Sequence, residues 1–135
     1  MKTHMRRCMR ALSFIALIML VQIPAVAQDA CERPSRPFQL VIVLVGNAPS
    51  EVTRGGVNAN NQNVCRGDTV VWRLPATSFT LTFDDGTPFD SAVLESDVSN
   101  AVSATVTDDA ERGREYKYDI ELANGDILDP RIIVD

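Results

Sequence analysis

Alternation of apolar and polar side chains along short segments is the feature that most constrains the fold of this chain. The clearest case runs from Tyr116 to Leu122, where the two tyrosines, Ile120 and Leu122 share one face and charged residues take the other. This period of two is typical of a β-strand that buries one face. Asn124-Gly125 follows directly, and a pair that tolerates positive φ at both positions favours a two-residue hairpin turn.

Similar short segments, separated by turn-forming residues, recur along the chain. We expect strands at 38–45, 69–74, 79–83, 102–106, 127–128 and 132–134. Segment 46–63, rich in Gly and Asn, is expected to be mainly loop with a short edge strand near 51–54. Segment 87–100 is expected to be irregular, with one helical turn near 91–96. Many short strands and little helix predict an all-β protein, a β-sandwich with antiparallel or mixed sheets.

The first 27 residues have the organisation of a secretory signal peptide. Basic residues precede an apolar run from Ala11 to Ile23, and Ala25-Val26-Ala27 fits a cleavage site of small residues. The apolar run is short for a membrane span. We therefore expect residues 1–27 to be a signal peptide and residues 28–135 to form one periplasmic or secreted domain, with no membrane insertion after the signal is removed.

Removal of the signal peptide would change the chemistry that the chain can carry. The only histidine, His4, and all four methionines lie within it. The exported domain would therefore lack the commonest general base and metal ligand. It would keep nine basic against 18 acidic residues, a formal charge of −9, which disfavours nucleic acid and anionic lipid as partners.

Two of the three cysteines, Cys31 and Cys65, lie in the expected exported domain, and Cys8 lies in the signal peptide. In an oxidising compartment such a pair usually forms a disulfide bond. We expect a Cys31–Cys65 disulfide that stabilises the fold by about 3–4 kcal/mol in the chain-entropy model.

Three segments, taken in their order and spacing, resemble cupredoxins, the plastocyanin-like β-sandwiches. These segments are Gly67–Trp72, Ser78–Phe83 and Glu115–Ile120, and the last is similar to the Tyr-x-Tyr-x-Cys run that enters the cupredoxin copper site. The likeness extends from about Cys65 to Val134. It implies a cupredoxin-like sandwich.

The copper of this family is held by two histidines, one cysteine and usually an axial methionine. At the matching positions Phe79 stands in place of the first histidine and Ile120 in place of the cysteine. Asp129-Pro130-Arg131 occupies the region of the terminal His/Met loop. We interpret Phe79 and Ile120 as vacated copper-site positions filled by hydrocarbon, and we expect neither a bound metal nor another cofactor.

The function expected from these observations is a non-catalytic, copper-free binding or interaction module of the bacterial envelope. It would be a monomer that recognises an envelope protein or a small ligand, whose identity the sequence does not give. Its contact surfaces are expected on segments 46–63 and 88–100, because a scaffold of this kind presents function on its connections.

Two other kinds of function stay open. A structural or adhesive subunit would assemble through a sheet edge, for which the strand after Pro130 is the candidate, since Asp129-Pro130 indicates a bulge or an edge position. The carboxylates between Asp84 and Asp97 could bind calcium, or Asp84 and Glu95 could serve a carboxylate-based enzyme.

Overall fold

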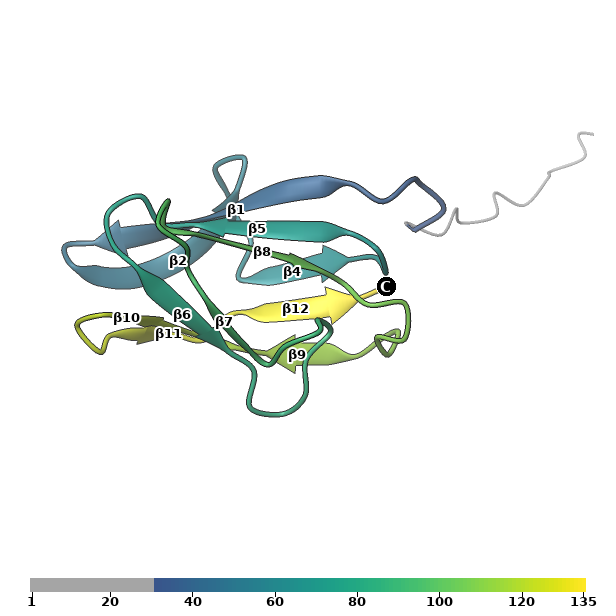
Figure 1. Ribbon diagram of the computed structural model, residues 1–135. Coiled ribbons are helices and arrows are strands. Elements are labelled where there is room, and N and C mark those ends of the chain that lie inside the picture. Colours follow the sequence, from purple (N-terminus) through teal and green to yellow (C-terminus); the bar gives the residue numbers. More distant parts are fainter. Residues whose placement is uncertain (1–30) are drawn as a thin grey trace, which may run out of the picture.

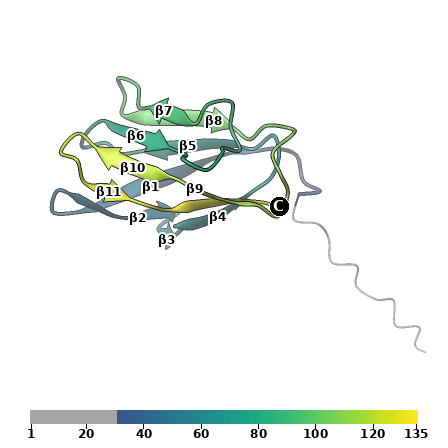
Figure 2. The same ribbon diagram turned by 90° about the horizontal axis from the view of Figure 1, so that it is seen from below.

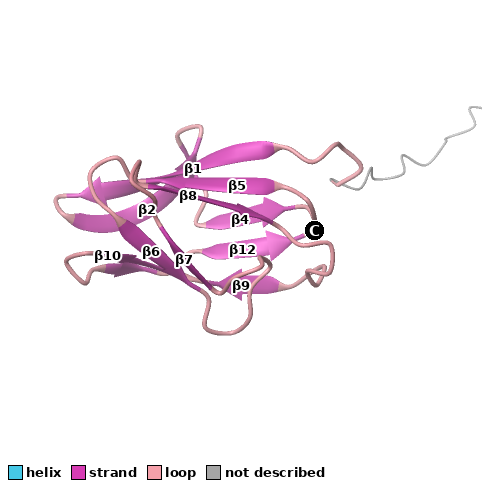
Figure 3. Cartoon of the chain, viewed as in Figure 1, coloured by secondary structure: helices cyan, strands magenta, loops and turns pink. Residues whose placement is uncertain are grey.

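The computed structural model describes residues 31–135, and the expected signal peptide, with His4 and Cys8, lies outside the described residues. Every regular element of this part is a strand, and the strands form two layers (Figure 1). Figure 3, coloured by secondary structure, shows the same arrangement of strands and loops. Within residues 31–135 no helix is long and apolar enough to cross a membrane. The predicted all-β sandwich is confirmed.

The first layer is a five-stranded mixed sheet in the order β3-β2-β1-β5-β8. Its strands are β1 (Pro37–Val45), β2 (Ala48–Arg54), β3 (Val57–Asn58), β5 (Thr69–Arg73) and β8 (Ala101–Thr105). The central pair β1 and β5 is parallel, and the other neighbours are antiparallel. Alternate residues of β5 point into the core, as the sequence predicts.

The second layer contains two small sheets that continue into each other, in the orders β11-β10-β6-β7 and β4-β12-β9. Its strands are β4 (Asn61–Val64), β6 (Phe79–Thr82), β7 (Val93–Glu95), β9 (Glu115–Lys117), β10 (Asp119–Leu122), β11 (Ile127–Leu128) and β12 (Arg131–Val134). Only Tyr118 separates β9 from β10, and its N–H donates to the carbonyl of Pro130 between β11 and β12 (3.1 Å). The turned view shows these strands running on from one another (Figure 2).

Two of the expected loop segments contain strands. Segment 46–63 was expected to be mainly loop, but it forms β2, β3 and most of β4, because the backbone of β2 pairs with β1 along its length. The Asn60 side chain accepts a hydrogen bond from the N–H of Val52 (2.7 Å), so the asparagines of this segment support strands as well as turns. The helical turn expected near 91–96 is wrong: β7 lies there and pairs with β6.

The strand after Pro130 is not at an edge, which corrects the expectation from the sequence. β12 lies between β4, to which it is parallel, and β9, to which it is antiparallel. Proline is tolerated because it occupies the break between β11 and β12, where its carbonyl still accepts the Tyr118 hydrogen bond.

The turn after Leu122 also differs from the two-residue form that was expected. The N–H of Leu122 donates to the carbonyl of Asp126 (3.0 Å), and the N–H of Gly125 donates to that of Leu122 (2.9 Å). Gly125 adopts a φ of 87°, whereas Asn124 is not among the residues with positive φ. The hairpin exists, but its loop has three residues and only glycine takes the left-handed conformation.

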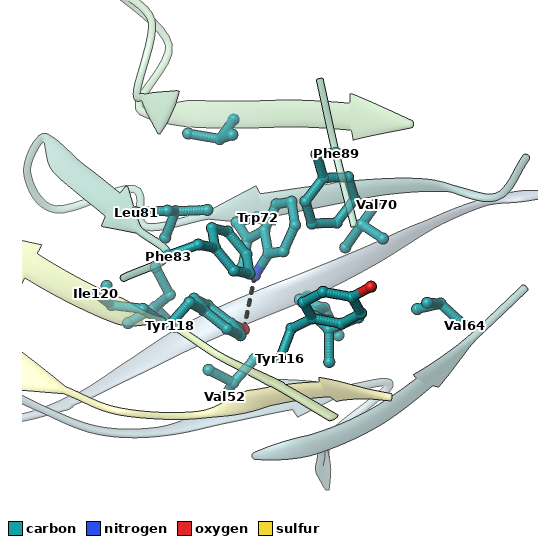
Figure 4. Close-up of a cluster of buried hydrophobic side chains, with 14 of the residues drawn as sticks. Val52, Val64, Val70, Trp72, Leu81, Phe83, Phe89, Tyr116, Tyr118 and Ile120 are labelled. Carbon is teal, nitrogen blue, oxygen red and sulfur yellow. Dashed lines mark hydrogen bonds between the residues drawn. The ribbon is translucent and has the colours of Figure 1, made fainter. Parts of the chain in front are cut away.

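An aromatic cluster between the layers forms the centre of the core (Figure 4). The Trp72 indole N–H donates to the Tyr118 hydroxyl at 3.0 Å, so both buried polar groups have a partner. The Phe83 ring stacks on Tyr118, and Phe89 packs edge-on against Trp72. Burial raises the pKa of the Tyr118 phenol, although the Trp72 hydrogen bond opposes this shift. The phenol therefore stays protonated at neutral pH.

The predicted disulfide between Cys31 and Cys65 is present and ties the N-terminal segment to the end of β4. The buried carboxylate of Asp68 adds a second connection, since it accepts hydrogen bonds from the Arg33 guanidinium (2.8 and 3.1 Å) and from the N–H groups of Arg36 and Cys65. Burial alone would raise the pKa of Asp68, but these hydrogen bonds outweigh it and lower the pKa. Asp68 is therefore ionised in the folded protein at neutral pH.

Candidate functional site

Both vacated positions lie inside the hydrophobic core. Phe79 is 3% exposed and Ile120 is fully buried. They come from the neighbouring strands β6 and β10, where Phe79 pairs with Leu122 and Ile120 with Leu81. Between residues 31 and 135, no group of three or more His, Cys, Asp or Glu residues could hold a metal ion. The side chains at these positions supply carbon atoms only.

A groove of about 410 Å³ opens to solvent beside Phe79. We call it the acidic groove; its lining residues are Ser78, Phe79, Thr80, Glu95, Ser96, Glu121, Leu122 and Ala123. Glu121 of β10 and Glu95 of β7 are the cross-strand neighbours of Thr80, one on each side. Ile120 does not line this groove, so the groove reaches Phe79 but does not extend to Ile120.

A second, smaller groove of about 290 Å³ adjoins the first, and we call it the end groove. It is lined by Leu44, Asn47, Ala76, Thr77, Leu122, Ala123 and Asn124. The Asn124 amide donates to the carbonyl of Asn47 (3.1 Å) and so links the turn after β10 to the turn after β1. Both turns lie at the left-hand end of the molecule in Figure 1. Leu122 and Ala123 line both grooves, so the two grooves are neighbours at this end of the sandwich.

The segments expected to make contacts account for part of this surface. Asn47 lies in segment 46–63, and Glu95 and Ser96 lie in segment 88–100. The remaining lining comes from Leu44 of β1, from 76–80, between β5 and β6 and into β6, and from 121–124 around the end of β10. Sequence reasoning missed these residues as a site because Asn124-Gly125 indicates a turn but not what that turn meets.

The acidic segment 84–97 is used in part to build its own turn. One carboxylate oxygen of Asp97 accepts hydrogen bonds from the Ser99 hydroxyl (2.6 Å), the Ser99 N–H (2.8 Å) and the Ala101 N–H (3.2 Å). These bonds, that of the Ser99 side chain first, lower the pKa of Asp97. Glu95 and Glu121 line the acidic groove on either side of Thr80, and Asp84 does not line either groove. Asp84 and Glu95, the carboxylates named for an enzyme, are thus not brought together in either groove.

The two edge strands on one side of the sandwich, β7 and β8, are partly capped by their own chain. In β8, Ala101 exchanges hydrogen bonds with the carboxylate and N–H of Asp97, and just beyond it Thr107 donates to the carbonyl of Pro88. In β7, the Ser91 hydroxyl donates to the carbonyl of Val93 at 2.7 Å. These contacts occupy backbone groups that an added strand would need. These particular groups, at or just beyond the strand ends, are therefore not free for assembly.

Comparison with known proteins finds matches only among solved structures. No family model matches the chain. No curated protein matches it either. Among solved structures, the chain is similar to amicyanin, a copper protein of the cupredoxin family. A reduced Cu(I) proline-to-glycine variant at pH 4 and the Cu(I) form of a methionine-to-alanine variant each share 19% identity, over 77% of this chain and 87% of theirs, with a TM-score of 0.47. At this identity the similarity concerns the fold alone.

Proposed function

We propose that the exported domain is a non-catalytic, copper-free binding module with a cupredoxin-like fold, acting in the periplasm or outside the cell. The observation that carries this proposal is the burial of Phe79 and Ile120 at the positions where the resemblance implies copper ligands. Neither side chain has an atom that coordinates a metal ion. The scaffold is kept, and binding takes place on its surface.

The hollowed end of the sandwich is the proposed contact surface. Its two grooves share Leu122 and Ala123 and combine apolar side chains with a few hydroxyl, amide and carboxylate groups. This mixture is typical of sites that take a ligand or a partner's side chains. The surface is formed at the ends of paired strands, and the hydrogen bond between Asn124 and Asn47 connects two of its turns. These connections support a preorganised binding surface.

Copper titration of the purified exported protein tests the metal-free part of the proposal. We expect no intense thiolate-to-copper absorption, because Ile120 stands where the resemblance implies the thiolate. A saturable blue band at one equivalent of copper would refute the proposal.

Capture of partners from an envelope fraction tests the contact surface. Ala123→Arg places a long side chain where the two grooves meet, and Ser103→Arg places the same side chain at an exposed position of β8 as a matched control. We expect a partner that binds the wild type and the control but not Ala123→Arg. Equal capture by both variants would exclude this end as the site. Light scattering after size-exclusion chromatography tests the alternative of a structural or adhesive subunit, which would form a ladder of oligomers.

A further inference from the structure

Charged side chains are arranged differently on the two halves of the outer face of the second layer. On the half formed by β9 and β12, Arg131 pairs with Glu115, and Lys117 pairs with Asp129 at 2.9 Å. On the half formed by β10, β6 and β7, the outward residues include Asp119, Glu121 and Glu95. None of the ion pairs found among residues 31–135 involves these three carboxylates.

The strand register places these carboxylates on one surface. One cross-strand row contains Ile127, Glu121, Thr80 and Glu95, and the next contains Asp119, Thr82 and Val93. We call these seven residues the acidic face. Because neighbouring strands lie about 4.8 Å apart, the backbones of Glu121 and Glu95 are separated by roughly 10 Å, with Thr80 between them. Three members of the first row, Glu121, Thr80 and Glu95, line the acidic groove.

Like charges gathered on one face of a sheet raise the free energy of the folded protein, and opposite charges across strands lower it. The same layer pairs opposite charges on β9 and β12. On the acidic face, by contrast, none of the seven residues is a lysine or an arginine. Val93 and Ile127, at opposite sides of the face, are 52% and 56% exposed. Carboxylates around a groove, with exposed apolar side chains beside them, are complementary to a basic protein surface.

We infer that the acidic face docks a basic surface of a partner protein, whose arginine or lysine side chain enters the acidic groove between Glu121 and Glu95. The aliphatic stem of such a side chain would lie against Leu122 and Ala123, and its charged end would meet the two carboxylates and the hydroxyl of Thr80. The excess of acidic residues in the whole chain would speed the encounter with a basic partner. This inference rests on the proposed binding function and names the partner's chemistry.

A hexa-arginine peptide titrated into the exported protein tests this inference. Backbone amide shifts in NMR spectra report where the peptide binds, and calorimetry reports its Kd. We expect shifts concentrated at Thr80, Glu95 and Glu121. The double variant Glu95→Gln/Glu121→Gln should raise the Kd about tenfold or more. The matched control Asp84→Asn/Asp85→Asn removes the same charge from the loop after β6 and should change the Kd much less.

Three results would overturn the inference. They are amide shifts spread over all the acidic loops, equal weakening by the two double variants, and spermine binding as tightly as the peptide at the same amides, which would assign the face to small cations. Envelope capture separates this inference from the proposed function. A partner that is lost with Ala123→Arg but kept with Glu95→Gln/Glu121→Gln would leave the binding function intact and exclude a basic partner on this face.

Discussion

Truncation of Phe79 to alanine measures how much this side chain, at a position where the resemblance implies a copper ligand, contributes to the stability of the core. The Phe79 side chain is 3% exposed and lies within the core cluster. Removing a buried aromatic ring typically costs 3–5 kcal/mol of unfolding free energy. Phe79 also lines the acidic groove, so water can enter part of the space that the ring leaves. We therefore expect a loss at the lower end of this range, about 3 kcal/mol.

Urea unfolding followed by tryptophan fluorescence measures this loss, because Trp72 is the only tryptophan of the chain and is fully buried. Thr80→Ala, in the same strand but facing outward, is the matched control and should change stability by less than about 0.5 kcal/mol. A loss below about 1 kcal/mol for Phe79→Ala would refute the reasoning, since removal of a ring that packs in the core lowers the unfolding free energy by more than this. Phe79 would then be a surface residue.

Three further predictions concern the rest of the core and the N-terminal connection. Tyr118→Phe leaves the Trp72 N–H without its buried acceptor and should lower the unfolding free energy by about 1–3 kcal/mol; an unchanged urea midpoint would contradict this. Thiol counting of a denatured protein of residues 28–135 should find no free thiol, and reduction of the Cys31–Cys65 bond should cost about 3–4 kcal/mol. The pKa of Asp68 is lower in the folded than in the unfolded chain, so its contribution is present above the unfolded value of about 3.9 and is lost as the pH falls through the folded pKa. Urea midpoints should therefore fall in acid, and Asp68→Asn should flatten that fall.

The predictable part of the fold is the part that local pattern controls. The alternation of Tyr116 to Leu122 gives the correct buried face of β9 and β10, and the two remaining cysteines give the correct disulfide. Segment 46–63 was predicted poorly because asparagine and glycine favour turns in isolation. Here pairing of β2 with the long strand β1 overrides that preference.

Only individual residues of the candidate site, and not their arrangement, were predictable from the sequence. Glu95 and Glu121 each stand out as polar positions beside apolar ones, but they come from separate parts of the chain, and β6 lies between them in the sheet. Alternation assigns a residue to a face and does not identify the neighbouring strand. The sequence therefore could not show that these two carboxylates flank Thr80.

The sequence by itself determined that this protein is a small all-β domain with one disulfide and with carbon side chains at Phe79 and Ile120, because side-chain period and residue chemistry are local properties. Only the tertiary structure decided which strands are edges, that β12 lies inside its sheet, and that the turns after β1 and β10 meet. Those outcomes depend on pairing between distant segments, where the free energy of burial and hydrogen bonding selects one arrangement among many that the local pattern permits.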